Sequence, residues 1–197
     1  YFDMYVPIVE DVKTKFEYKE GCELVIDSLS ILGSEYVDNI KEAINNRYID
    51  IYENEGKRSG AYSGGSFETK PFILLNYTDT LNDVFTLMHE LGHSMQSLYT
   101  NKNQTFSNSH YKIFVAEIAS TVNELFLFEH MLEITNDINV KKYLLNYNLD
   151  QFRSTVYRQT MFGEFEYKSS KLLFFYFFFH FLFNFLSKTL ILMSKEI

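Results

Sequence analysis

The segment His89-Glu90-Leu91-Gly92-His93 places two imidazoles and a carboxylate at a spacing that suits metal chemistry. Residues four apart lie on one face of an α-helix, about 5–6 Å apart at Cβ, so both imidazoles can reach one metal ion. Glu90 lies about 100° further round the helix and does not face the metal as a ligand. It can instead take a proton from a zinc-bound water, whose pKa the metal lowers to about 7. The motif therefore predicts zinc ligands at His89 and His93 and a general base at Glu90.

A catalytic zinc ion usually has a third protein ligand besides its water. No H-x-x-G-x-x-H continuation follows His93, so we expect a carboxylate from a second helix. Glu117 lies between Ala116 and Ile118 in a segment of small and apolar residues, where a charge needs a partner such as zinc. Glu124 lies two turns further along the same face. It is either a hydrogen-bond acceptor for a ligand histidine or a surface charge, and the sequence favours neither.

A long helix must carry the histidine pair. Thr80-Leu-Asn-Asp83 resembles a capping box with Asp in place of Glu, which marks a helix start. From Leu81 to Leu98 apolar residues recur at spacings of three and four, which gives one apolar face. The flanking Leu87, Met88 and Leu91 are expected to bury the two histidines. Gly92 costs about 1 kcal/mol relative to Ala inside a helix, which a close approach by another backbone or a ligand would explain.

The remaining periodicity predicts a mainly α-helical scaffold. Residues 8–47 hold two helices that meet at Gly33-Ser34, and residues 111–134 and 140–162 hold one each. The polar run 101–109 is predicted to be a loop. The fold class is therefore mainly α, with a small β element before the central helix.

The β element precedes the histidine motif and has two interpretations. Residues 56–66 hold four of the eight Gly and lack the G-x-x-x-x-G-K-[ST] order of a phosphate loop, so they are predicted to be a loop or a loose hairpin tip. The apolar run 71–77 suits a strand. Strand and loop form either a plain connecting hairpin or an edge above the zinc helix, to which an extended peptide adds by backbone hydrogen bonds. In the second case Tyr62, Ser63 and Gly64 are the candidate substrate-binding residues.

Composition excludes several classes of protein. The 197 residues allow one domain with a real core, and 18 basic against 26 acidic side chains give a net charge of −8. This acidic balance argues against a nucleic-acid partner. The lone Cys22 excludes a disulfide framework and any zinc site built on several Cys. No signal-peptide pattern is visible, and we expect a cytoplasmic protein.

Three runs of the sequence closely resemble the oligoendopeptidase F family, zinc metallopeptidases of the thimet-oligopeptidase-like group. These runs are KRSGAYSGGSF, PFILLNYTDTLNDVFTLMHELGHSMQSLYT and YKIFVAEIASTVNE, and the resemblance covers about residues 4–166. It implies a zincin-type, mostly helical fold with a deep cleft. It also implies one zinc ion held by His89, His93 and Glu117, with Glu90 as general base. The implied activity is that of a zinc metalloendopeptidase that hydrolyses short peptides and excludes folded proteins.

The sequence departs from the family's pattern beyond residue 166. Family members are several times longer and carry, after a segment resembling TVYRQTMFGEFE, His and Tyr residues that stabilise the oxyanion of the tetrahedral intermediate. Here His180 and Tyr176 do not match that pattern. Loss of an oxyanion donor typically costs about 10²–10³ in rate. The alternative to an active enzyme is therefore a catalytically inactive zinc-binding fragment that lacks this segment.

We accordingly predict two regions, a partial zinc metallopeptidase catalytic domain over 1–166 and a Phe-rich tail over 167–197. The first carries 14 basic and 25 acidic side chains, and the second carries 4 Lys and 1 Glu. Residues 172–186 alone hold 8 of the 20 Phe. We interpret the tail as low-complexity sequence from a truncated or misread coding region. The alternative is a membrane helix over 172–193, which reaches the required length only by including five polar residues.

Overall fold

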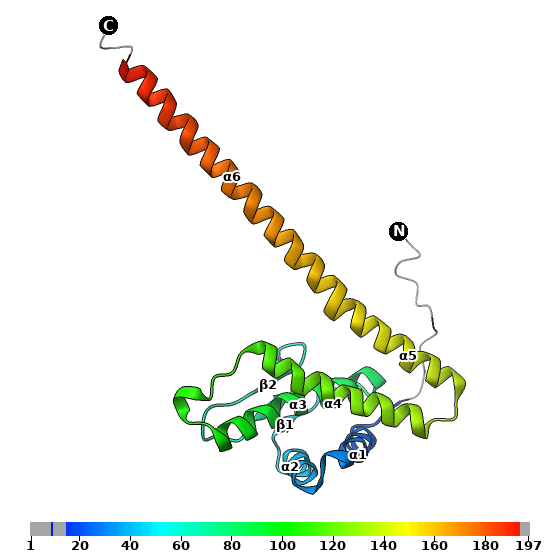
Figure 1. Ribbon diagram of the computed structural model, residues 1–197. Coiled ribbons are helices and arrows are strands. Elements are labelled where there is room, and N and C mark those ends of the chain that lie inside the picture. The colour runs from blue at the N-terminus through cyan, green and yellow to red at the C-terminus, as the bar shows by residue number, and fades with distance from the viewer. Residues whose placement is uncertain (1–8, 10–14, 194–197) are drawn as a thin grey trace. The chain divides into compact units, whose positions relative to one another are not determined.

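The computed structural model describes residue 9 and residues 15–193. For residues 180 and 182–193 it describes only the backbone. The chain divides into two units, Tyr1–Leu144 and Leu145–Ile197, which we describe separately. The first unit holds four α-helices, a small sheet and the beginning of a fifth helix (Figure 1).

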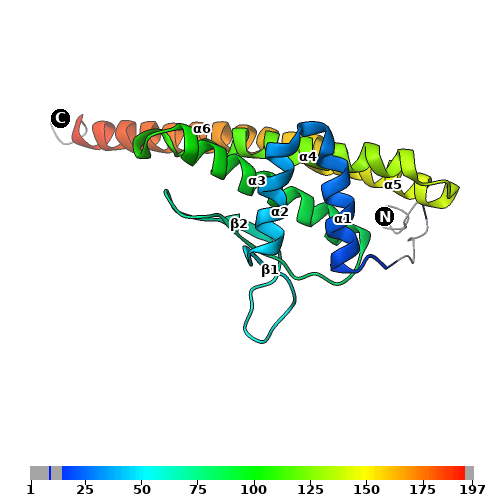
Figure 2. The ribbon, with the colours of Figure 1, turned by 90° about the horizontal axis from the view of Figure 1, so that it is seen from below.

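Two short helices open the first unit. These are α1 (Tyr18–Ser28), continued by the 3-10 turn η2 (Leu29–Leu32), and α2 (Ser34–Asn45). The predicted break between two helices is confirmed, because Gly33 separates them with a φ of 88°, a left-handed conformation that favours glycine. Both helices contact the long central helix and lie beside each other (Figure 2).

The central helix α3 (Leu81–Asn103) packs most extensively against α4 (Ile113–Ile134). Both helices were predicted, although α3 continues three residues into the segment predicted to be a loop. A short 3-10 turn, η3 (Phe106–Asn108), lies within the connection between them. The core beneath α3 includes Leu87, Met88 and Leu91, which are fully buried.

The small sheet has three strands in the order β1-β3-β2. The strands are β1 (Ile49–Asp50), β2 (Tyr62–Gly64) and β3 (Phe72–Leu74). β1 is parallel to β3, and β2 is antiparallel to β3 with Ser63 opposite Ile73. The predicted strand in 71–77 is confirmed, but part of the segment predicted to be a loop forms the edge strand β2. The Tyr-Ser-Gly sequence of β2 has no alternation of apolar and polar residues, so β2 is recognised as a strand only by its pairing with β3.

The second unit is helical throughout its described length. α5 (Ile138–Phe152) crosses the division, a π-helical turn η4 (Arg153–Tyr157) follows, and α6 (Arg158–Met193) continues through the Phe-rich run. The sequence predicted a helix only to residue 162. Among the described residues, no helix combines the length and the apolar character needed to cross a membrane. The predicted boundary at residue 166 and the origin of the tail stay predictions.

Candidate metal centre

The capping box predicted at the start of α3 is present. The Thr80 side chain accepts a hydrogen bond from the Asp83 backbone N–H at 3.2 Å, and an Asp83 carboxylate oxygen accepts one from the Thr80 N–H at 3.0 Å. These reciprocal bonds satisfy donors that the first helical turn leaves unpaired. They fix where α3 begins, and therefore which side chains share its faces.

The apolar neighbours of the histidines do not bury them as expected. Leu87, Met88 and Leu91 point into the core, whereas the side chains of His89 and His93 keep 29% and 18% of their surface exposed. Leu87, Met88 and Leu91 are two before, one before and two after His89, so they lie on other faces of α3. Their apolar character therefore anchors α3 and leaves the two imidazoles at an accessible surface.

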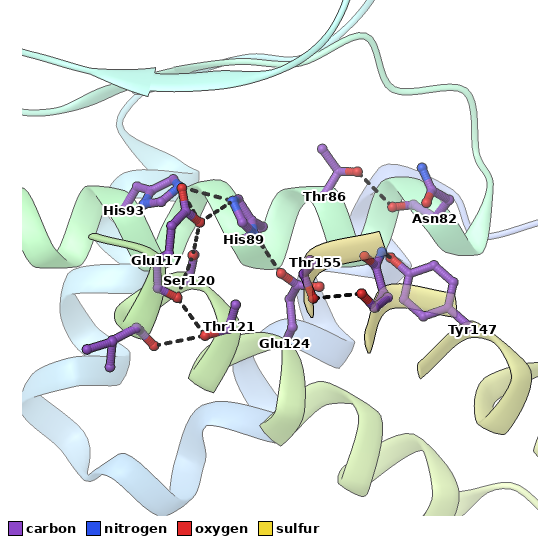
Figure 3. A network of polar contacts seen from close by, with 12 residues as sticks. Asn82, Thr86, His89, His93, Glu117, Ser120, Thr121, Glu124, Tyr147 and Thr155 are labelled. Carbon is purple, nitrogen blue, oxygen red and sulfur yellow. Dashed lines mark hydrogen bonds and ion pairs between the residues drawn. The ribbon is translucent and has the colours of Figure 1, made fainter. Parts of the chain in front are cut away.

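His89, His93 and Glu117 come together at the contact between α3 and α4 (Figure 3). One potential ligand atom from each lies within 4.8 Å of the other two. The two Nε2 atoms are 3.0 Å apart, and Glu117 Oε2 lies 3.5 Å from His89 Nε2 and 3.8 Å from His93 Nε2. Two imidazole nitrogens and one carboxylate oxygen form a donor set that zinc prefers, and it leaves a fourth position open.

Gly92 explains how α4 comes close enough to supply Glu117. A Cβ atom at Gly92 would lie 2.7 Å from Ser120 Cα and 2.9 Å from the Ala119 carbonyl oxygen. Both are backbone atoms, so no side-chain rotation makes room for it. The close backbone approach expected from a helical glycine is therefore confirmed, and it occurs one turn beyond Glu117.

Hydrogen bonds from α4 orient the candidate ligands. Glu124 Oε1 lies 2.5 Å from His89 Nδ1, which leaves Nε2 of that ring directed at the cluster (Figure 3). Ser120 donates from Oγ to Glu117 Oε2 at 3.0 Å. Glu124 therefore contacts His89, as the acceptor interpretation expects, and its support of a metal ligand stays a prediction.

The pKa values of the two histidines shift in opposite directions. Burial by itself lowers the pKa of His89, but the hydrogen bond and the charge of Glu124 outweigh it, so the pKa is raised. The pKa of His93 is lowered, first by burial and then by the nearby charge of His89. The lowered pKa of His93 favours its neutral form, which is the form of imidazole that binds metals.

Glu90 is buried beside the cluster, with 6% of its surface exposed. The backbone of Ser63, in β2, favours the ionised form of this carboxylate, but less strongly than burial disfavours it. One carboxylate oxygen, Oε2, is buried without a hydrogen-bond partner among the described residues. Burial raises the pKa of Glu90 above its usual range. A buried carboxylate with an oxygen that has no partner among the described residues suits proton transfer.

The edge strand β2 lies against α3 and joins it through side chains. Ser63 Oγ and Ser94 Oγ are 2.8 Å apart, and this contact joins β2 to α3 at the residue after His93. Of the three candidate substrate-binding residues, only Ser63 contacts the site in this way. Tyr62 packs edge-to-face on Phe72, with ring centroids 6.0 Å apart, and Gly64 lies under the same ring. Sequence reasoning missed Ser94 and Ser120, because no spacing marks a serine whose partner is on another element.

Comparison with known proteins shows the family to which the chain belongs. The model of Peptidase family M3 matches residues 5–171. Oligopeptidase PepF of Bacillus subtilis is 48% identical over 166 residues, 84% of this chain and 25% of its own length. The chromosomal oligoendopeptidase F of Lactococcus lactis subsp. cremoris is 50% identical over 167 residues, 85% of this chain and 28% of its own.

Solved structures show the same fold. A crystal structure from Chlamydophila abortus, described as a peptidase, matches with a TM-score of 0.77 and 43% identity over 85% of this chain and 28% of that one. Oligoendopeptidase-F from Enterococcus faecium matches with a TM-score of 0.51 and 30% identity, over 84% of this chain and 21% of that one. The fold is therefore one that these peptidase structures share. The chain belongs to peptidase family M3, and it spans about a quarter of the length of the curated relatives it matches.

Proposed function

We propose that this chain carries the zinc centre of an endopeptidase that hydrolyses short peptides. The observation that carries the proposal is the convergence of His89, His93 and Glu117 within 4.8 Å, beside the buried carboxylate of Glu90. Membership of peptidase family M3 and relatives named oligopeptidase and oligoendopeptidase support the reaction class.

The residues present fit a zinc ion. His89 and His93 would bind it through Nε2 and Glu117 through its carboxylate, with Glu124 and Ser120 holding two of these ligands in place. When bound, zinc supplies Lewis acidity, which polarises a carbonyl oxygen and lowers the pKa of water to about 7.

The chain's own groups account for the proton transfers. Glu90 Oε2, which has no hydrogen-bond partner among the described residues, takes the proton from the attacking water. The protonated carboxyl then passes this proton to the nitrogen of the leaving amine. The raised pKa of Glu90 suits this return step, because a weaker acid keeps its proton until the amine nitrogen accepts it.

The substrate backbone would lie along β2. This strand is at the edge of the sheet, and its far side pairs with no strand among the described residues. An extended peptide can add to such an edge by main-chain hydrogen bonds. Because β2 contacts α3 through Ser63 and Ser94, a peptide bound there lies beside the metal ligands.

Cleavage of a quenched fluorescent peptide tests the proposal. We expect cleavage by the zinc-loaded chain to stop when a strong chelator is added and to resume with zinc. Glu90→Gln keeps the shape of the side chain and should retain zinc while losing cleavage. Cleavage that survives both the chelator and Glu90→Gln would overturn the assignment.

A second candidate is a zinc-binding unit without peptidase activity of its own. The chain spans about a quarter of the length of its relatives. This favours the second candidate, because the rest of the relatives' length can supply walls of a substrate site. This candidate predicts that the chain binds zinc through the same residues but cleaves no peptide. Zinc analysis and the cleavage assay on one preparation separate the two.

A further inference from the structure

A second feature of the first unit is a cavity of about 380 Å³ next to the metal centre. Three segments line it, and each is continuous in sequence with an element that contributes to the metal centre or contacts it. Gly65 directly follows β2, Ser97 lies one turn beyond His93 on α3, and Tyr111 lies just before α4. The cavity is therefore in line with the metal site along α3, and its volume lies in the range of small-ligand pockets.

The walls of the cavity are held in place by contacts between these segments. Ser97 Oγ and the Tyr111 hydroxyl are 2.6 Å apart, which joins α3 to the residues before α4. Phe67 and Phe106 meet edge-to-face, with ring centroids 5.6 Å apart at 77°, and form another part of the lining. The loop 65–71 and the 3-10 turn are thereby tied together around the space.

The lining is aromatic and hydroxyl-rich and carries no fixed charge. Phe67, Phe106 and Tyr111 offer ring surface, and Ser, Thr and Asn side chains supply neutral polar groups. No Asp, Glu, Lys or Arg lines the cavity, and His110 is its one imidazole. A charged guest would find no opposite charge among the lining residues. An aromatic guest would pack edge-to-face on the rings already present.

We propose that this cavity is the subsite for an aromatic side chain, Phe or Tyr, of the peptide substrate. The inference rests on the proposed function. One turn of α3 is about 5.4 Å, so Ser97 and Asn101 lie about one and two turns from His93. An extended peptide along β2 advances about 3.3 Å per residue, which reaches the cavity in two to three residues. The preferred residue therefore lies on one side of the scissile bond, two or three positions away.

Peptide binding to the full chain tests this inference. Zinc-loaded Glu90→Gln would be titrated with dye-labelled Ala-based hexapeptides that carry Phe, Tyr, Leu, Asp or Lys at one position. We expect Phe and Tyr to bind best and Asp and Lys worst, with about a three- to tenfold gain for the aromatic contact. Phe106→Ala should remove that gain, and because Phe106 is 64% exposed the change should leave the fold intact.

Phe165→Ala is the matched control, since Phe165 is 69% exposed on α6 and does not line the cavity. It should keep the aromatic preference. A photoreactive benzoyl-phenylalanine at the preferred position should attach to residues 65–71, 97–101 or 106–111. Equal affinity for all five peptides, a preference that persists in Phe106→Ala, or attachment elsewhere would overturn the inference. Zinc content, measured separately on each sample, shows whether the proposed function itself has failed.

Discussion

Replacement of Gly92 by Ala tests whether the close packing of α3 on α4 assembles the metal centre. The added Cβ would lie 2.7 Å from Ser120 Cα, against about 3.4 Å for ordinary contact. The difference, 3.4 − 2.7, is about 0.7 Å, and α4 has to move by roughly this amount because the obstructing atoms are backbone. Glu117 lies one turn before Ser120 and moves with it.

Two opposing contributions set the size of the effect. Ala in place of Gly in a helix interior stabilises by about 1 kcal/mol, whereas overpacking typically costs about 1–3 kcal/mol. We therefore expect Gly92→Ala to leave the zinc-free protein unchanged or to lower its free energy of unfolding by up to about 2 kcal/mol. Metal–ligand distances tolerate only about 0.2 Å, so a shift of 0.7 Å should lower zinc affinity at least about tenfold.

The assay is a competition for zinc with a chromophoric chelator, together with denaturant unfolding of the zinc-free chain. Gly163→Ala is the matched control, because a Cβ at Gly163 on α6 meets no atom within 4 Å. That variant should bind zinc normally and be at least as stable as the parent. The reasoning is refuted if Gly92→Ala gains stability as Gly163→Ala does and binds zinc with unchanged affinity.

Three further predictions concern groups that support the site. Glu124→Gln should weaken zinc binding about 10- to 100-fold without abolishing it, and unchanged affinity in the chelator competition would mean that the contact of Glu124 with His89 does not support the metal site. Asp83→Ala should lower the free energy of unfolding at pH 7 by about 1 kcal/mol. Burial opposes ionisation of Asp83, but hydrogen bonds from Thr80 and its neighbours prevail and lower the pKa. The contribution of Asp83 is therefore present above the unfolded pKa of about 3.9 and lost as pH falls through the lower folded value. Denaturant titrations from pH 7 to pH 2 should show this loss in the parent and not in the variant. Ser94→Ala should slow peptide cleavage about fivefold, the equivalent of one hydrogen bond of about 1 kcal/mol to Ser63, with zinc content unchanged; a loss of zinc would instead mean that Ser94 supports the metal centre.

The sequence predicted those parts of the site that depend on local geometry. The four-residue spacing of His89 and His93 places them on one face of any helix, and Thr80 with Asp83 marks where that helix begins. The cost of Gly92 in a helix pointed to a close neighbour, and the neighbour is the backbone of α4. Each of these inferences follows from helix geometry alone.

The parts that failed depend on contacts between distant segments. β2 is three residues long and its Tyr-Ser-Gly sequence resembles a loop, so its pairing with β3 leaves no local signal. The histidines were expected to be buried because their neighbours are apolar, but those neighbours face the core on other sides of α3. Ser94 and Ser120 act through partners on β2 and α4, which no spacing in the sequence reveals.

The ratio of zinc to protein is the most direct test of the metal centre. After dialysis against a weak chelator, we predict about one zinc ion per parent chain and almost none in His89→Ala or His93→Ala. Glu117→Ala should retain zinc only weakly, and His130→Ala, a control on α4 outside the cluster, should match the parent. Full zinc retention by His89→Ala and His93→Ala, or a parent chain that binds no zinc, would contradict the account.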